Sequence, residues 1–180
     1  MTVFWTGKGD GGETGAMGNG RIWKDSAQAN ALGDIDELNS VIGVTIANMT
    51  DEHISNLLMS IQNNLFVIGA EISAADETVK LPGKIKPTDI KGLEGEIDDI
   101  GAKVPELKKF VLPGGSISGS YLHLSRSIAR RAERSIVTLS KTKEINKNIP
   151  AYLNRLSSFL FAAALYMNKK EGIEESNPSY

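Results

Sequence analysis

The chain has 180 residues and a formal net charge of −2, with 20 lysines and arginines against 22 aspartates and glutamates. This length predicts a single domain that buries a core, and the near-neutral charge excludes an overall attraction to nucleic acid or to anionic lipid. The absence of cysteine excludes disulfides, thiol catalysis and thiolate metal sites. We find neither a secretory signal nor an apolar run near the ~20 residues of a membrane span, so we expect a cytoplasmic protein without membrane contact.

The first unusual segment is TGKGDGGETGAMGNG, residues 6–20, which contains seven glycines. Glycines let backbone N–H groups approach a ligand closely, as in loops that cradle phosphate. Gly7, Gly9 and Gly12 match G-x-G-x-x-G, but no buried strand precedes them and no helix can follow directly, so the dinucleotide fingerprint is excluded. A Walker A loop is excluded because no G-K-[ST] follows. A phosphate loop of another kind and a flexible tail both remain open.

Beyond this segment the apolar residues recur at steps of three and four, the spacing of one helical face. Asp25, with Gln28 three residues later, resembles a capping box and predicts the start of a first helix, whose apolar face extends to Met49. A second helix is predicted over residues 54–72.

Two irregular segments, 76–87 and 105–115, flank a shorter third helix over 90–104. Ser116 can cap a fourth helix with an apolar stripe reaching residue 139, and a fifth helix covers 149–167. No segment beyond the first five residues alternates as a strand does. The pattern predicts an all-α protein, a five-helix bundle with a glycine-rich N-terminal loop. Within this single domain, residues 1–24 form the loop, 25–170 the bundle and 171–180 a tail.

Four of the six arginines of the chain lie within nine residues: Arg126, Arg130, Arg131 and Arg134. We call Arg126, Arg130 and Arg134 the arginine row, because helical spacing places them within an arc of ~80° opposite the apolar stripe. Like charges at this spacing repel one another, so the row costs stability unless anions meet it. Arginine suits phosphates and carboxylates held in fixed geometry. A solvated helix face is the alternative.

Three further features carry open alternatives. The acidic cluster Asp34, Asp36 and Glu37 suits metal ligation, ion pairs to the arginines, or a plain surface near a helix start. Asn154 suits a satisfied core amide or a ligand contact. Phe110 lies in KKFVLPGG between two prolines, where it could plug the end of the bundle or wall a flat ligand, and the residues alone favour the plug.

Six motifs, in order and spacing, resemble the PduO-type ATP:corrinoid adenosyltransferases: TGKGDGGETG, WKD, ALGDIDELNS, FVLPGG, HLSRSIARRAER and YLNRLSSFLF. The resemblance covers residue 4 to about 168. It implies a five-helix bundle, usually a homotrimer with ATP at subunit interfaces. The implied enzyme is a transferase that moves the 5′-deoxyadenosyl group of ATP onto the cobalt of reduced cobalamin or another corrinoid, giving adenosylcobalamin and triphosphate. Mg²⁺ would be bound through ATP, with no metal site assigned to the protein.

The resemblance also implies residue roles. The loop around the triphosphate corresponds to Thr6, Gly7, Lys8, Gly9, Asp10, Gly12 and Thr14, with Lys24 as a further contact. The other nucleotide contacts correspond to Arg130, Arg131, Glu133, Arg134 and Asn154. Asp36 and Arg126 would pair across the subunit boundary, and Phe110 would wall the corrinoid and displace its lower axial ligand. The residues implied in catalysis are therefore Arg130, Phe110, Asp36 and Arg126.

The chain departs from the family pattern at two positions. Gly7 stands where most members carry a lysine or arginine, and Val67 replaces an aspartate in LFVIG.

The resemblance further implies a cob(II)alamin reductase and an adenosylcobalamin-dependent enzyme as partners, with no nucleic acid. The alternative functions are a non-catalytic nucleotide or corrinoid sensor or chaperone, and a purely structural bundle.

Overall fold

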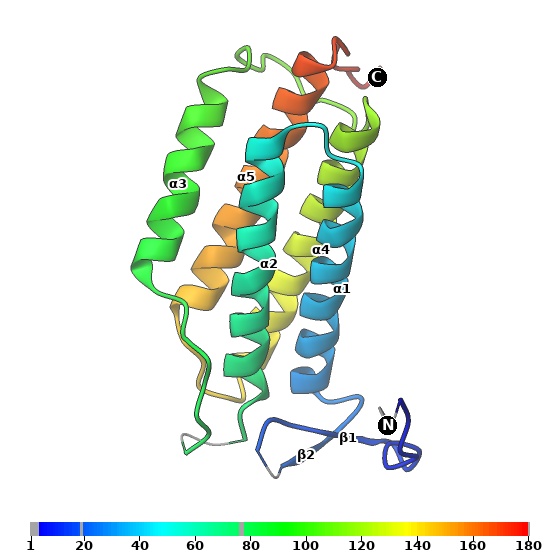
Figure 1. Cartoon of the computed structure of the whole chain (residues 1–180), viewed down its shortest axis with the longest axis vertical. Helices are drawn as coiled ribbons and strands as arrows, with labels where there is room; N and C mark the ends of the chain where they lie inside the picture. Colours follow the sequence, from blue (N-terminus) through cyan, green and yellow to red (C-terminus); the bar gives the residue numbers. More distant parts are fainter. Residues whose placement is uncertain (1–3, 19, 76–77, 180) are drawn as a thin grey trace.

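The computed structural model describes residues 4–18, 20–75 and 78–179. Its helices are α1 (Ala27–Ala47), α2 (Glu52–Ser73), α3 (Pro87–Gly101), α4 (Ile117–Leu139) and α5 (Asn148–Lys170). They run side by side along the long axis of the molecule, with the N-terminal segment at one end and the C-terminus at the other (Figure 1). The predicted five-helix bundle is confirmed. Within the described residues, none of these helices is long and apolar enough to cross a membrane.

The core lies between α1, α2, α4 and α5, and α3 packs mainly on α5. Its members are the apolar residues that recur at helical spacing, among them Leu38, Leu65, Ile136, Leu156 and Phe159, which are fully buried. The periodicity of the sequence therefore determines which face of each helix points inward.

Side chains cap the starts of α1, α2 and α4. Ser116 caps α4 as predicted, since its Oγ accepts a hydrogen bond from the N–H of Gly119 at 3.0 Å. The capping box predicted at Asp25 and Gln28 is wrong by one residue. Ser26 is the cap, and Gln28 instead donates to the carbonyl of Ile72 on α2 at 2.8 Å. This long-range contact has no local signal in the sequence.

A short hairpin, β1 (Glu13–Gly15) and β2 (Arg21–Trp23), follows the first glycines. The two strands pair antiparallel, with Thr14 opposite Ile22. The sequence pattern does not predict this hairpin, because strands of three residues are too short to display alternation. The alternation expected in the first five residues lies partly outside the described residues, and Phe4 and Trp5 are exposed and not in a strand.

At the opposite end, Asn168 of α5 lies fully buried at the start of α4. Its Oδ1 accepts from the N–H of Ser116 at 2.9 Å and from the Ser116 hydroxyl at 3.0 Å. Its Nδ2 donates to the carbonyl of Gly114 at 2.9 Å and to Glu175 Oε1 at 3.0 Å. We call Asn168 and these three partners the Asn168 cluster. It explains the second glycine of the PGG segment, since a Cβ at Gly115 would lie 2.3 Å from Asn168.

Candidate functional site

The glycine-rich loop is held by backbone hydrogen bonds. The N–H of Asp10 donates to Gly7 at 3.2 Å and the N–H of Gly12 donates to Gly9 at 3.3 Å, which makes two successive turns. Gly7 and Gly12 have φ values of +67° and +88°, which residues other than glycine rarely adopt. The positive φ at residue 7 therefore favours glycine at the position where the family pattern has a lysine or arginine.

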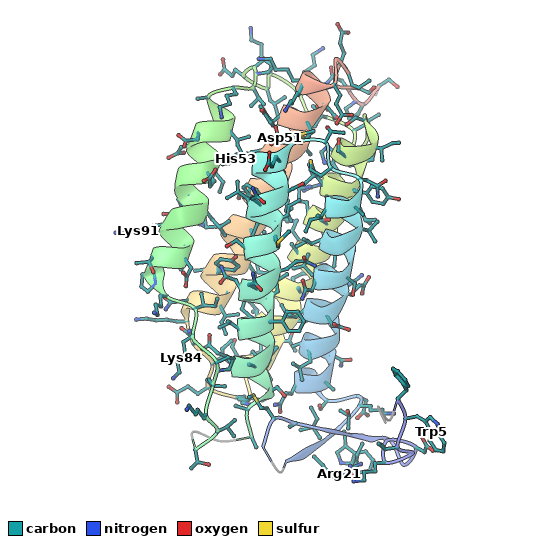
Figure 2. The ribbon with its side chains drawn as sticks, viewed as in Figure 1. Trp5, Arg21, Asp51, His53, Lys84 and Lys91 are labelled. Atoms are coloured by element: carbon teal, nitrogen blue, oxygen red, sulfur yellow. The ribbon has the colours of Figure 1, made fainter. Side chains whose placement is uncertain are left out.

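Two cations lie against this loop. A Cβ at Gly9 would be 3.2 Å from Lys24 Nζ, so the ammonium group of Lys24 lies over the turns. Arg21 donates from Nη2 to the carbonyl of Lys8 at 2.7 Å and from Nε to Glu13 at 3.1 Å. Figure 2 shows Arg21 at this end of the molecule together with Trp5. A curved, glycine-rich backbone with a lysine above it is suited to binding phosphate groups. Sequence analysis did not assign Arg21 a role, and its contacts depend on the hairpin that was missed.

The arginine row lies on α4. Arg130 and Arg134 are exposed, and both line a hollow of about 450 Å³ together with Glu133, Val137, Thr138 and Asn154. Asn154 donates to Glu133 Oε1 at 3.0 Å and accepts from Arg155 at 2.7 Å. Among the described residues, no side-chain hydrogen bond or ion pair occupies the guanidinium of Arg130 or Arg134. The hollow thus combines two free cations with one carboxylate whose orientation is set by Asn154.

Arg126 differs from the other two. Its side chain lies over the ring of Phe161, 5.5 Å from the centroid, and its Nε is buried without a hydrogen-bond partner in the part of the chain described. Burial, and then the charge of Arg130, lower its pKa. The expectation that the whole row faces solvent is therefore wrong for Arg126, because the interface with α5 partly covers this turn of α4.

The acidic cluster is divided between two sides of α1. Arg131 donates from Nε to Asp34 at 3.0 Å and from Nη2 to Glu37. These bonds raise the pKa of Arg131, with the bond to Glu37 contributing most. Ion pairing within the chain is thus the outcome for Asp34 and Glu37, with Arg131 and not with the arginine row. The described residues contain no group of three or more side chains that could hold a metal ion.

Asp36 is exposed on another side of the same helix. It lines a groove of about 400 Å³ between α1 and α2, together with apolar residues that include Leu32 and Phe66. No ion pair joins Asp36 to Arg126 in the described chain, and no hydrogen bond links residues 6–14 to the arginine row. Within the described chain, therefore, no hydrogen bond or ion pair joins the loop, the arginine row and Asp36 to one another.

Phe110 lies between α3 and α4 with 80% of its surface exposed. The prediction that it plugs the bundle is therefore wrong. Its carbonyl accepts a hydrogen bond from Asn177 Nδ2 at 2.8 Å, and the N–H of Leu112 donates to Ser176 at 2.8 Å. The tail, expected to be a separate segment, thus lies along the Phe110 segment. The ring is held on an anchored backbone and remains available to contact a ligand.

Comparison with known proteins finds relatives that match nearly the whole chain. The family model described as cobalamin adenosyltransferase matches residues 4–167. A corrinoid adenosyltransferase of Bacillus subtilis is 43% identical over 174 residues, which is 94% of this chain and 89% of that protein. A corrinoid adenosyltransferase of Citrobacter freundii is 35% identical over 179 residues, with 99% and 98% covered.

The structure is also similar to solved ones. A variant of a PduO-type ATP:corrinoid adenosyltransferase from Lactobacillus reuteri, complexed with cobalamin and ATP, superposes with a TM-score of 0.92 at 36% identity. The match covers 98% of this chain and 96% of the other. A second variant of that protein, complexed with ATP, gives a TM-score of 0.90 at the same identity.

Proposed function

The chain belongs to the cobalamin adenosyltransferase family, and on this premise we propose that it transfers the 5′-deoxyadenosyl group of ATP to the cobalt of a reduced corrinoid. The observation that carries the proposal is the pairing state of the cations. Arg131 is engaged by two carboxylates of its own chain, whereas Arg130 and Arg134 are exposed beside a hollow, and no carboxylate among the described residues binds them. Unpaired arginines together with a glycine-rich loop favour a polyanion such as triphosphate.

The reaction balances without a protein nucleophile or base. The electron pair of Co(I) attacks C5′ of ATP and forms the cobalt–carbon bond. The bond between C5′ and its oxygen breaks, and triphosphate leaves with the electron pair of that broken bond. Cobalt, whose own pair is now in the cobalt–carbon bond, becomes Co(III). No proton has to move, which agrees with a chain that lacks cysteine and has only two histidines. The task of the protein is to align cobalt with C5′ and to stabilise the charge on the leaving group.

Each part of the site then has a role. The turns at residues 7–12 and Lys24 bind the triphosphate, and Arg130 and Arg134 stabilise the charge that develops on it. Glu133 and Asn154 orient one another beside the nucleotide. No acidic cluster in the described residues could hold a metal by itself, so Mg²⁺ would enter bound to the phosphate oxygens. A direct contact of Arg131 with the nucleotide stays a prediction, since its guanidinium already donates to Asp34 and Glu37 of α1.

The complete site requires more than one subunit. Asp36 lies in a groove with the exposed Phe66, which is 73% accessible. Arg126, on another helix, carries a charge that no carboxylate pairs with in the part of the chain described. A second copy that places Asp36 against Arg126 would cover the exposed apolar residues and neutralise the charge. We therefore propose a homotrimer with sites between subunits. The Asp36→Asn variant should weaken both assembly and activity. A wild-type mass of one chain, 19.4 kDa, by light scattering at micromolar concentration would refute this proposal.

Phe110 acts on the corrinoid in this proposal. Its exposed ring would occupy the lower axial side of cobalt, which makes the reduction of Co(II) to Co(I) easier. A separate cob(II)alamin reductase would supply the electron, and an adenosylcobalamin-dependent enzyme would use the product. The cytoplasmic location expected from the sequence likewise stays a prediction.

One assay tests the function. The protein is mixed with ATP and chemically reduced cobalamin, and the absorbance change to adenosylcobalamin is followed. The expected result is turnover that requires both substrates and that is much slower in the Arg130→Ala variant. Tight binding of ATP and corrinoid without any product would contradict the proposal and favour a sensor or chaperone. Absence of binding would leave only a structural bundle.

A further inference from the structure

The hairpin that carries the glycine-rich loop is fastened to the bundle at the end of α2. The N–H of Met17 donates to the carbonyl and to the Oγ of Ser73, both at 3.0 Å. The N–H of Ala75 donates back to the carbonyl of Met17 at 3.1 Å. Figure 1 shows the hairpin lying across this end of the molecule, below α1 and α2. The position of the loop thus depends on the position of the last turn of α2.

That last turn is fixed by two side chains from elsewhere. The final carbonyls of a helix have no partner within the helix and need other donors. Lys143 Nζ, from the connection between α4 and α5, donates to the carbonyl of Ile72 at 3.1 Å and to that of Ala74 at 2.6 Å. Gln28 of α1 donates to the same Ile72 carbonyl at 2.8 Å. An ammonium group at a helix C-terminus is also favoured by the helix dipole.

The environment of Lys143 keeps its ammonium group on the carbonyls at the end of α2. It is half-buried, and burial lowers its pKa. No carboxylate pairs with it among the described residues, so the two carbonyls of α2 are the acceptors that its charge requires. Removing the ammonium group would leave both carbonyls with fewer donors and would free the turn that holds Met17.

We propose that Lys143 is a positioning residue for ATP, acting through the end of α2 and Met17 on the glycine-rich loop. The inference rests on the proposed function, because that function assigns the loop to the triphosphate. Misplacing a binding loop weakens the contacts that it makes. Loss of Lys143 should therefore raise the KM for ATP, while kcat at saturating ATP and the KM for the corrinoid change little.

The chain provides a reporter that needs no ligand. It has two tryptophans, and both lie in this N-terminal region, Trp5 with 82% and Trp23 with 61% of its surface exposed. In a Trp5→Phe background, the fluorescence anisotropy of Trp23 reports on β2 alone. Lys143→Met keeps the length and the apolar stem of the side chain and removes its charge. Lys91→Met, on the outer side of α3, is the matched control (Figure 2).

The expected result is that Lys143→Met lowers the anisotropy of Trp23 and raises the KM for ATP ~10-fold or more, with kcat and the corrinoid KM within about twofold of wild type. Lys91→Met should change none of these values, and Lys143→Arg should recover most of the ATP affinity. A folded Lys143→Met protein with unchanged anisotropy and unchanged KM would overturn the proposal. Lower anisotropy with an unchanged KM would overturn the link between the loop and ATP. A wild type that fails to turn over ATP refutes the proposed function, yet the anisotropy still tests the anchor.

Discussion

The Asn168 cluster, where α5 meets the start of α4, and the arginine row along α4 are two polar regions that differ in how their hydrogen-bonding groups are satisfied. Asn168 is fully buried, and its amide makes four hydrogen bonds within the chain. Arg130 and Arg134 have exposed guanidinium groups without a partner in the described chain, and Arg126 has a buried Nε without one. Polar groups that are satisfied internally stabilise the fold, whereas those left open are available to a ligand or a second subunit.

This comparison predicts its largest effect on stability at Asn168. The Asn168→Leu variant would leave the buried N–H of Ser116 and the part-buried carbonyl of Gly114 without their partners. We expect the free energy of unfolding to fall by ~3–5 kcal/mol. Chemical denaturation measures this change. Asn56→Leu, at an exposed position of α2, is the control and should be nearly neutral. A loss at position 168 no greater than that of the control would remove the distinction between the two regions.

Arg130 should behave in the opposite way. The Arg130→Ala variant is expected to lose ~2–4 kcal/mol of transition-state stabilisation, measured as kcat/KM, with the free energy of unfolding unchanged within ~0.5 kcal/mol. Its neighbour Arg131 is a direct contrast, because its pairs with Asp34 and Glu37 are part-exposed. Arg131→Ala should cost ~1 kcal/mol of stability. If Arg130→Ala keeps the wild-type kcat/KM, the row does not serve the nucleotide.

Phe110 sharpens the comparison, because its exposed ring is attached to a backbone that the tail holds through Asn177. Truncating a buried plug would cost ~3–5 kcal/mol of stability, whereas Phe110→Ala should leave the melting temperature and ATP affinity nearly unchanged. Turnover from Co(II) with a reductant should fall on the order of tenfold or more, about 1.4 kcal/mol.

Excess Co(I) should restore much of the Phe110→Ala activity, since Co(I) needs no axial displacement. Electron paramagnetic resonance of bound Co(II) provides the independent check. A four-coordinate signal that survives in Phe110→Ala would exclude the proposed role of the ring.

The smallest effect concerns His123, whose ring packs on Phe161 with centroids 5.9 Å apart and whose two ring nitrogens are buried without partners among the described residues. Burial, and then the charge of Arg126, lower its pKa from 6.5. Below about pH 6.5 the unfolded chain binds a proton that folded His123 resists. As the pH falls from about 6.5 to the pKa of folded His123, this group alone should therefore lower the free energy of unfolding by at most ~1.4 kcal/mol per pH unit.

Unfolding titrations between pH 7 and pH 5 compare wild type with His123→Phe, which keeps an aromatic ring on Phe161. The variant should lose this part of the pH dependence, while His53→Phe, at an exposed position, should retain it. Equal slopes in all three proteins would show that His123 does not titrate differently in the folded and unfolded chains.

The sequence by itself determined the features that depend on residues close together in the chain. Helical spacing of apolar residues predicts all five helices, and Ser116 marks the start of α4 through a bond to a residue three positions away. The clustering of arginines, the glycine-rich loop and the six ordered motifs are local as well. They were sufficient to predict the bundle and the family.

Tertiary structure decided which side chains meet. Asp34 and Asp36 are two positions apart and therefore ~200° apart on α1, so one binds Arg131 while the other faces the groove beside α2. The backbone of the Phe110 segment is held by Ser176 and Asn177 of the tail, which lie more than 50 residues away in sequence. The anchoring of the hairpin depends on Lys143 and Gln28, each bound to α2 carbonyls that any sequence would carry. Backbone acceptors leave no trace in the pattern of residues, and only folding brings their donors to them.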